Sequence, residues 1–336
     1  MLGAVAQLVA GLLAVLMSAW LFTNALEWVG LRMGLSHSAL GSVFAALGTA
    51  LPEASIAVLA ALAAGPVQGG PGDAISIGAV LGAPLLLATL GFAVLGLGAL
   101  RAGRSALRAS PTGLRRDMGF FLLAFGVAAV LGVVGAPPLV RWPAGAALLG
   151  AYAVFILRTL HGESGAGEDG PVPAPLLLSL RRRGSGPAQP PPAWAMAAQV
   201  TLAVGVMFGG AELFVQTLTS LSLRLGLSGF VLAALIAPLA TELPETVNSL
   251  VWLGQDKDAL ATGNVTGALV LQGAVIPAVG MWFTPWAFDS LEAVAAAVAW
   301  LGALAVLLGY RRTGRLSPWL LLAVGALYVG FALWVL

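Results

Sequence analysis

Apolar stretches of about 20 residues recur along the whole chain, and this feature restricts its fold more than any other. A helix rises about 1.5 Å per residue, so each stretch can cross the roughly 30 Å hydrocarbon core of a bilayer. Only 9% of the 336 residues are charged and 59% are hydrophobic, whereas about a quarter of the residues in a soluble domain are charged. Because a helix satisfies its own backbone hydrogen bonds in lipid, the chain is predicted to be an all-α integral membrane protein.

The apolar stretches divide into ten predicted transmembrane helices. The first stretch is too long for the apolar region of a signal peptide and no basic segment precedes it, so we expect it to be retained. The chain has no cysteine, which excludes disulfides and thiolate ligands. The predicted spans are 4–27, 39–64, 74–100, 118–135, 144–160, 196–219, 229–253, 259–283, 290–309 and 317–336.

Basic residues fall almost entirely in alternate loops between these spans. Fourteen of the 16 lie on one side, and only Arg141 and Arg224 lie on the other. The positive-inside rule therefore predicts that the basic side is cytoplasmic, in the cell inner (plasma) membrane, with both termini on the extracytoplasmic side. The polar segment 161–194 is rich in Gly and Pro, and it is predicted to be a cytoplasmic linker between two five-span halves, 1–160 and 195–336.

An internal repeat relates the two halves. LRMGLS at 31–36 matches LRLGLS at 223–228 with an offset of 192 residues. The same offset, without a gap, places Leu-Pro-Glu at 51–53 on Leu-Pro-Glu at 243–245. Because the copies begin five spans apart, and five is odd, the second copy is predicted to cross the membrane in the opposite sense. Inverted repeats with Pro-interrupted helices at matching positions are typical of secondary transporters.

The pairing of proline with glutamate inside an apolar span indicates a cation site. Proline removes a helical N–H and opens the preceding turn, which frees carbonyl oxygens that a hard cation prefers. Glu53 and Glu245 would supply charge, and Thr49 and Thr241, one turn earlier, would supply oxygen ligands. A single such proline is often only a kink and a single glutamate only a buried protonated group, but two Leu-Pro-Glu sites at one offset favour the cation site.

GTALPE at 48–53 and PLATELPE at 238–245 resemble the alpha-repeats of the cation/calcium exchanger superfamily, in particular its prokaryotic sodium/calcium antiporters. The resemblance implies ten helices, broken central helices, and alternating access around sites held by the two motif glutamates. It also implies that the first and sixth spans slide against the other eight. Carried over by position, the ligands are Glu53, Thr49, Glu245 and Thr241, with Asn264 on the eighth span.

The sequence departs from the family pattern in the first repeat. Ala79 stands where the family has an Asn, and Ala83 and Pro84 replace a Ser-Asn pair. Conversely, Glu242 of the second repeat corresponds to an alanine of the first, and Gln272 corresponds to a leucine. Both join the candidate ligands, so the predicted site is lopsided.

Glu242 lies three residues before Glu245 and could share its helix face. Two carboxylates this close in a dry site would not both stay ionised without a cation, which leaves proton coupling open. The alternative role for Glu242 is a hydrogen bond to the opened backbone of the broken helix.

These features predict a secondary antiporter that exchanges Ca²⁺ for Na⁺ or H⁺. The alternatives are a proton-coupled exchanger of another cation, and a channel or uniporter on the same scaffold. An enzyme is not expected, because the two histidines form no H-E-x-x-H motif and no P-loop is present. The predicted partners are the transported cations and the lipid bilayer, with no cofactor and no nucleic acid; a homo-oligomer is compatible with the sequence.

Overall fold

The computed structural model describes residues 2–32, 55–60, 62, 71–162, 191–226, 228–254, 256 and 258–336. Its regular structure in these residues is helical, apart from one isolated bridge between Leu107 and Leu316. The helices are α1 (Leu2–Arg32), α3 (Pro71–Leu86), the π-helix η1 (Leu87–Gly91), α4 (Phe92–Arg101), α5 (Pro111–Val133), α6 (Pro138–Gly162), α7 (Ala193–Leu225), α8 (Gly229–Thr241), α9 (Leu243–Gly254), α10 (Asp258–Phe283), α11 (Ser290–Thr313) and α12 (Pro318–Val335).

Eight helical segments in the described part of the chain are long and apolar enough to cross a membrane. Two of the ten predicted spans are not among them, each for its own reason. The span predicted at 39–64 lies mostly outside the described residues. The span predicted at 229–253 is divided into α8, with 13 residues, and α9, with 12 residues, so neither piece reaches the full length alone.

The fourth predicted span begins earlier than expected. The sequence predicted a start at residue 118, and this prediction was wrong, because α5 begins at Pro111. The Ser110 hydroxyl accepts a hydrogen bond from the Gly113 N–H (3.3 Å), and Pro111 occupies the first helical turn, where its missing N–H costs nothing. The additional two turns bring Asp117 into the helix.

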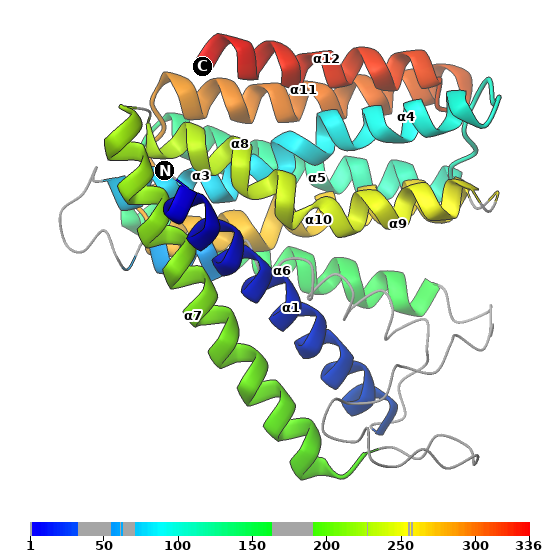
Figure 1. Cartoon of the computed structure of the whole chain (residues 1–336). Coiled ribbons are helices and arrows are strands. Elements are labelled where there is room, and N and C mark those ends of the chain that lie inside the picture. Colours follow the sequence, from blue (N-terminus) through cyan, green and yellow to red (C-terminus); the bar gives the residue numbers. More distant parts are fainter. Residues whose placement is uncertain are drawn as a thin grey trace.

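The continuous segment α3–η1–α4 and the helix α10 lie at the centre of the molecule (Figure 1). In the most apolar window of each, 83% and 78% of the residues are buried, against 17% in α6. α3 packs closely on α8, because a Cβ at Gly82 would lie 2.6 Å from the Ala234 carbonyl oxygen, and one at Gly78 would lie 2.7 Å from that of Phe230. Small residues thus allow two backbones to approach in the centre of the bundle.

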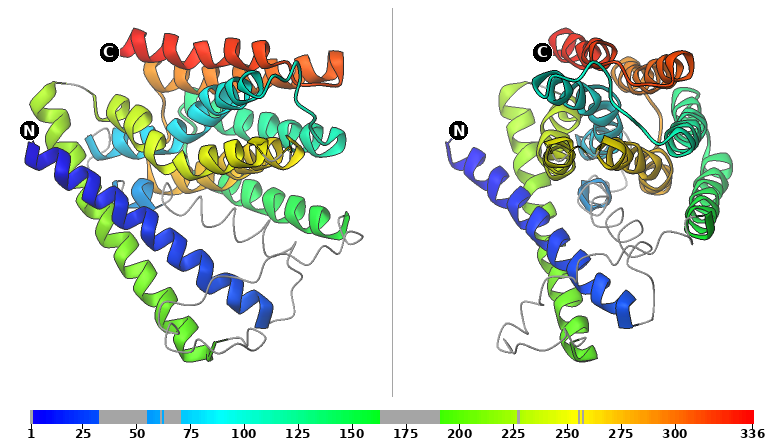
Figure 2. Two further views of the ribbon diagram at one scale, coloured as in Figure 1. Left: turned by 45° about the vertical axis from the view of Figure 1, so that its right-hand side comes forward. Right: turned by 90° about the vertical axis from the view of Figure 1, so that its right-hand side faces the viewer.

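α1 and α7 are the longest helices, and they pack along each other at the edge of the molecule (Figures 1 and 2). Their backbones touch where Gly11 meets Gly210: a Cβ on Gly11 would lie 2.8 Å from the Gly210 carbonyl oxygen. Farther along, the Gln199 amide donates to the carbonyl oxygen of Leu21 (2.9 Å) and to Asn24 Oδ1 (3.1 Å). The far ends of this pair diverge from the rest of the bundle (Figure 2).

Candidate cation-binding site

The predicted break in the seventh span is present. α8 ends at Thr241 and α9 begins at Leu243, with Glu242 between them at φ −89° and ψ −1°. Pro244 follows and lacks the N–H that would otherwise bond the carbonyl four residues earlier. The Glu242 carbonyl oxygen accepts from both the N–H (3.1 Å) and the hydroxyl (2.9 Å) of Thr246, which lies in the first turn of α9.

The break brings a carboxylate and an amide together from different elements. Gln272 of α10 donates from Nε2 to Glu242 Oε1 at 2.5 Å, and the two residues are only 3% and 1% exposed. Gln272 Oε1 is also buried and accepts no hydrogen bond from the described residues. Two of the polar side chains that the second repeat has and the first lacks are therefore direct neighbours. Carboxylate and amide oxygens are suitable ligands for a hard cation.

A second pair of side chains joins α9 to α10. Asn264 donates from Nδ2 to the hydroxyl of Ser249 (3.1 Å), and that hydroxyl donates to the Ala261 carbonyl oxygen (3.3 Å). Ser249 is buried and Asn264 is half-buried. α10 is therefore bonded to the break through Gln272 and to the piece after the break through Asn264.

The other predicted ligands are placed as follows. Thr241 is buried in the last turn of α8, and its hydroxyl donates to the Ala237 carbonyl oxygen of its own helix (3.2 Å). Glu245 lies in the first turn of α9, but its side chain is outside the described part of the structure, and so are Thr49 and Glu53 altogether. The structure brings Glu242 and Gln272 together and leaves the pairing of the two motif glutamates a prediction.

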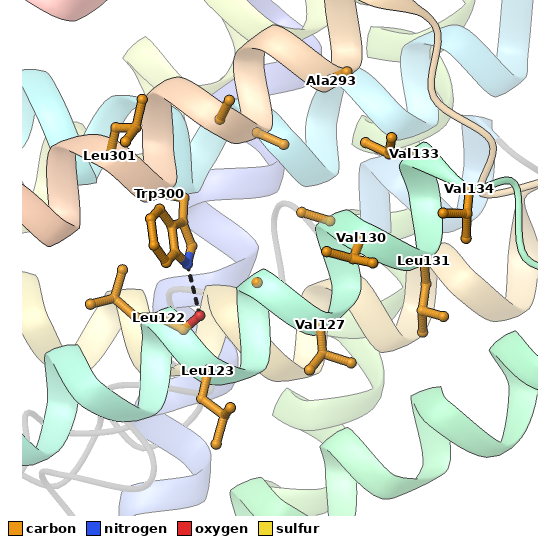
Figure 3. Close-up of a pocket in the computed structure, with 14 residues that line it drawn as sticks. Leu122, Leu123, Val127, Val130, Leu131, Val133, Val134, Ala293, Trp300 and Leu301 are labelled. Carbon is orange, nitrogen blue, oxygen red and sulfur yellow. Dashed lines mark hydrogen bonds between the residues drawn. The ribbon is translucent and has the colours of Figure 1, made fainter.

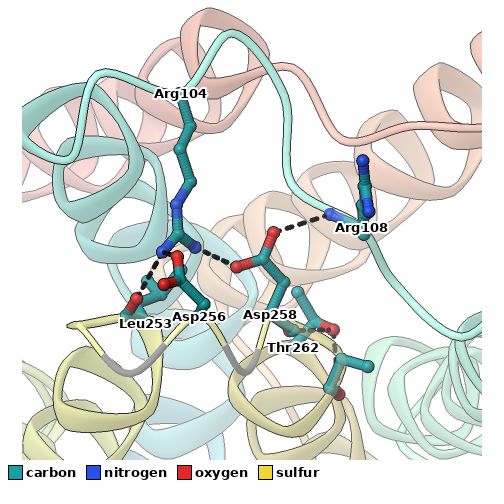
Figure 4. Close-up of polar contacts among 7 residues, drawn as sticks. Arg104, Arg108, Leu253, Asp256, Asp258 and Thr262 are labelled. Carbon is teal, nitrogen blue, oxygen red and sulfur yellow. Dashed lines mark hydrogen bonds and ion pairs between the residues drawn. The ribbon is translucent and has the colours of Figure 1, made fainter.

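Asp258, which starts α10, is bound on the side where the basic loops lie (Figure 4). Its carboxylate accepts from the Arg104 guanidinium and from the Arg108 N–H (3.1 Å), and Arg104 also donates to the Leu253 carbonyl oxygen (2.7 Å) and to Asp256 (2.5 Å). The loop after α4 therefore holds the turn between α9 and α10. This contact fits the ordinary role of an acidic residue at a helix N-terminus.

An apolar pocket of about 710 Å³ lies between α5 and α11 (Figure 3). Its walls are formed by side chains such as Val127, Val130 and Leu301, and no carboxylate, amide or hydroxyl group lines it. The Trp300 Nε1–H donates to the Leu122 carbonyl oxygen (2.9 Å) and is thereby satisfied. Such walls cannot replace the hydration shell of a cation, so this pocket is not the ion site.

Sequence reasoning missed one polar contact behind the site. Asp117 of α5 is buried and accepts a hydrogen bond from the Thr266 hydroxyl of α10 at 2.8 Å. The available signal was an acidic residue beside an apolar stretch, but the predicted span started one residue after it. Within the described residues, no three Asp, Glu, His or Cys side chains gather as a metal cluster.

Two solved structures of cation exchangers are similar to this one. The H⁺/Ca²⁺ exchanger CAX superposes with a TM-score of 0.76 at 19% identity, covering 98% of this chain and 82% of CAX. The sodium-calcium exchanger NCX_Mj superposes with a TM-score of 0.58 at 23% identity, covering 98% and 97%. These likenesses show a shared fold.

Sequence comparisons agree with the fold. A protein of Alkalimonas amylolytica described as "Putative antiporter CaxA" is 25% identical over 173 residues, which is 51% of this chain and only about half, 52%, of that protein. The family described as "Sodium/calcium exchanger protein" matches residues 3–160 and 196–336. The resemblance inferred from the two Leu-Pro-Glu segments is thereby confirmed, and the chain belongs to the sodium/calcium exchanger family of membrane transporters.

Proposed function

We propose that this protein is a secondary cation antiporter that exchanges Ca²⁺ for Na⁺ or H⁺ at a site near the membrane midplane. The observation that carries the proposal is the buried contact between Glu242, at the break, and Gln272 of α10. The break follows 13 helical residues and precedes 12 more, so it lies halfway along the seventh predicted span. A charged group at this depth is costly unless a cation or a proton neutralises it.

The proposed ligands come from both repeats. Glu242, Thr241, Glu245, Asn264 and Gln272 form the second half, and Glu53 and Thr49 form the first. A cation bound among these oxygens would offset the cost of burying the carboxylates. An empty and fully ionised site would resist exposure to low dielectric during the conformational change, which favours exchange over leak.

Helix directions support ten spans in two inverted halves. α1 and α7 are antiparallel, because Gly11 meets Gly210 while Leu21, farther along α1, meets the earlier Gln199. α3 and α8 are parallel, because the earlier glycine of α3, Gly78, contacts Phe230 and the later one, Gly82, contacts the later residue Ala234. Since α7 and α8 are consecutive and joined by a short turn, α1 and α3 must cross the membrane in the same direction.

Two helices that cross in the same direction need an odd number of crossings between them. The span predicted at 39–64 would provide this odd number between α1 and α3. With α8 and α9 counted as one broken span, the total is ten. Both termini then lie on one side, in agreement with the N and C labels at the same end of Figure 1.

These helix directions also agree with the proposed organisation of the two halves. The halves 1–160 and 195–336 are joined through the linker 161–194 on the side that carries the Arg104 loop. That side is proposed to be cytoplasmic, with both termini extracytoplasmic in the cell inner membrane. The sliding elements would be α1 and α7, which touch each other closely and diverge from the bundle at their far ends (Figure 2).

Flux into proteoliposomes tests the function. Ca²⁺ uptake is measured against an imposed Na⁺ gradient and, separately, against an imposed H⁺ gradient. We expect one gradient to drive uptake in the parent and to fail in Glu53→Gln and Glu245→Gln. Uptake that is equally fast without either gradient would indicate the channel or uniporter, and uptake unchanged in both variants would overturn the site.

A further inference from the structure

Asp117 lies on the far side of α10 from the proposed cation site. Its Oδ2 accepts the Thr266 hydroxyl at 2.8 Å, and its Oδ1 accepts Arg116 Nε at 3.0 Å. Asp117 and Thr266 are 6% and 1% exposed. A hydroxyl that donates to a buried carboxylate forms one of the stronger hydrogen bonds in proteins. The proposed exchange mechanism makes no use of this pair.

α5 touches α10 at a second point on the same stripe. A Cβ on Gly273 would lie 2.7 Å from the ring of Phe121, which is one helical turn after Asp117. Successive residues of a helix are rotated by about 100° about its axis, so positions 266 and 273, seven residues apart, face nearly the same direction. One hydrogen bond and one close contact between the Gly273 backbone and the Phe121 ring therefore hold α10 against α5.

The cation-side contacts of α10 lie outside the stripe that faces α5. By the same offset of about 100° per residue, position 264 lies about 160° around the helix axis from position 266, and position 272 lies about 120° from it, so neither shares the face that contacts α5. There Asn264 bonds Ser249, and Gln272 bonds Glu242. A rotation or a shift of α10 against α5 would move both amides relative to the broken helix.

We propose that Asp117 is a positioning residue, which sets the rotation and depth of α10 through Thr266 and thereby sets the affinity of the cation site. This inference rests on the proposed function. Among the described residues, Asp117 contacts no candidate ligand, and its link to the candidate ligands runs through Thr266 of α10. Arg116, whose guanidinium lies 5.1 Å from the ring centroid of Phe155 on α6, compensates the carboxylate charge and anchors this contact to a third helix.

The test compares Thr266→Val with a matched control, Thr262→Val. Thr262 lies one turn earlier on the same face and is equally buried at 1% exposure, but its hydroxyl donates only to carbonyl oxygens of its own helix, those of Asp258 (2.9 Å) and Ala259 (3.2 Å). We expect Thr266→Val to raise the half-saturating Ca²⁺ concentration of uptake by about threefold to tenfold, as for one lost hydrogen bond. Thr262→Val should leave it unchanged, and Thr266→Ser should restore the parent value.

Maximal uptake per folded protein separates positioning from simple stability. A stability role would lower the amount of folded protein in both threonine variants and leave the half-saturating concentration alone. Asp117→Ala combined with Thr266→Val should give no larger shift than Asp117→Ala alone, because both remove one contact. An unchanged half-saturating concentration in Thr266→Val, or an equal shift in Thr262→Val, would overturn the inference.

A geometric readout keeps this test separate from the proposed function. The chain has no cysteine, so Ser249→Cys with Asn264→Cys introduces a single pair between α9 and α10. Disulfide formation needs specific geometry, and we expect Thr266→Val to slow it by about threefold or more relative to Thr262→Val. A parent without gradient-driven Ca²⁺ uptake would refute the function alone, whereas equal disulfide rates in the two backgrounds would refute the positioning role.

Discussion

The two central segments, α3–η1–α4 and α10, occupy corresponding places in the sequence repeat but differ in chemistry. Both are largely buried, at 83% and 78% of their apolar windows. α10 carries Asn264 and Gln272, whereas the aligned positions of the first repeat are Ala79 and Leu87. The backbone differs as well, because the position of Leu87 opens a π-helix and α10 remains α-helical throughout. The two copies of the sequence repeat are thus both buried, but the candidate polar ligands of these two segments lie in the second copy.

Their packing partners also differ within the described residues. Gly78 and Gly82 of α3 face the backbone of α8 closely. Their repeat partners on α10, Gly263 and Gly267, meet no described atom within 4 Å of a Cβ. The comparison between the halves therefore concerns both ligands and helix contacts, and variants can test each separately.

The largest expected effect comes from removing the carboxylate of Glu242, because the aligned position of the first repeat is an alanine. We expect Glu242→Gln to reduce gradient-driven Ca²⁺ uptake by about 100-fold, because the site loses a charged ligand in low dielectric. Glu212→Gln is the control, since Glu212 is an exposed carboxylate of α7 whose Oε1 accepts from Gln216 of the same helix. Equal rates in Glu242→Gln and the parent would contradict a lopsided site.

The next effect concerns packing of the first half. Gly82→Ala should lower the free energy of unfolding by about 2–3 kcal/mol, because the new Cβ meets the α8 backbone and Pro238 at 2.6 Å. The measurement is the thermal unfolding midpoint in detergent. Gly205→Ala of α7, with no described atom within 4 Å of its Cβ, should be neutral or slightly stabilising. Gly267→Ala tests the corresponding position of α10. If it lowers the free energy of unfolding as much as Gly82→Ala does, α10 has an equally close partner there.

A smaller effect follows from making the second half resemble the first. Gln272→Leu introduces the residue found at the aligned position and removes the donor to Glu242. We expect uptake to fall by about tenfold, since a buried acceptor loses its hydrogen bond. The reverse change, Leu87→Gln, should not restore uptake when it is combined with Gln272→Leu. Restored uptake in that double variant would show that the halves are interchangeable.

The smallest effect concerns the loop that holds α9 to α10. Arg104→Gln should lower the free energy of unfolding by about 1–2 kcal/mol, because Asp258 and the Leu253 carbonyl oxygen lose a charged donor. The pair with Asp256, a residue with a 90% exposed side chain, contributes little. Arg108→Gln is the matched control, since Arg108 reaches Asp258 through its backbone N–H. Similar unfolding midpoints for the two variants would rule out a role for the guanidinium.

Local features of the fold were predictable from the sequence. The broken helix follows from the proline in TELPE, because a missing N–H acts within one turn. Asp258 lies in the first turn of α10, where an acidic residue is an ordinary local signal for a helix start. Asp117 was not recognised, because its place within α5 depends on the Ser110 cap and Pro111, and its partner Thr266 lies 149 residues away in sequence.

The sequence alone determined that the chain is a multi-span membrane protein with a duplicated Leu-Pro-Glu segment, since span length, charge bias and helix breaks depend on residues close together in the chain. Only the tertiary structure decided that Gln272 bonds Glu242 and that α5 holds α10 from behind. These contacts depend on the rotation of each helix about its axis. That rotation is fixed by packing between segments far apart in sequence, and apolar stretches that face lipid and protein alike do not encode it locally.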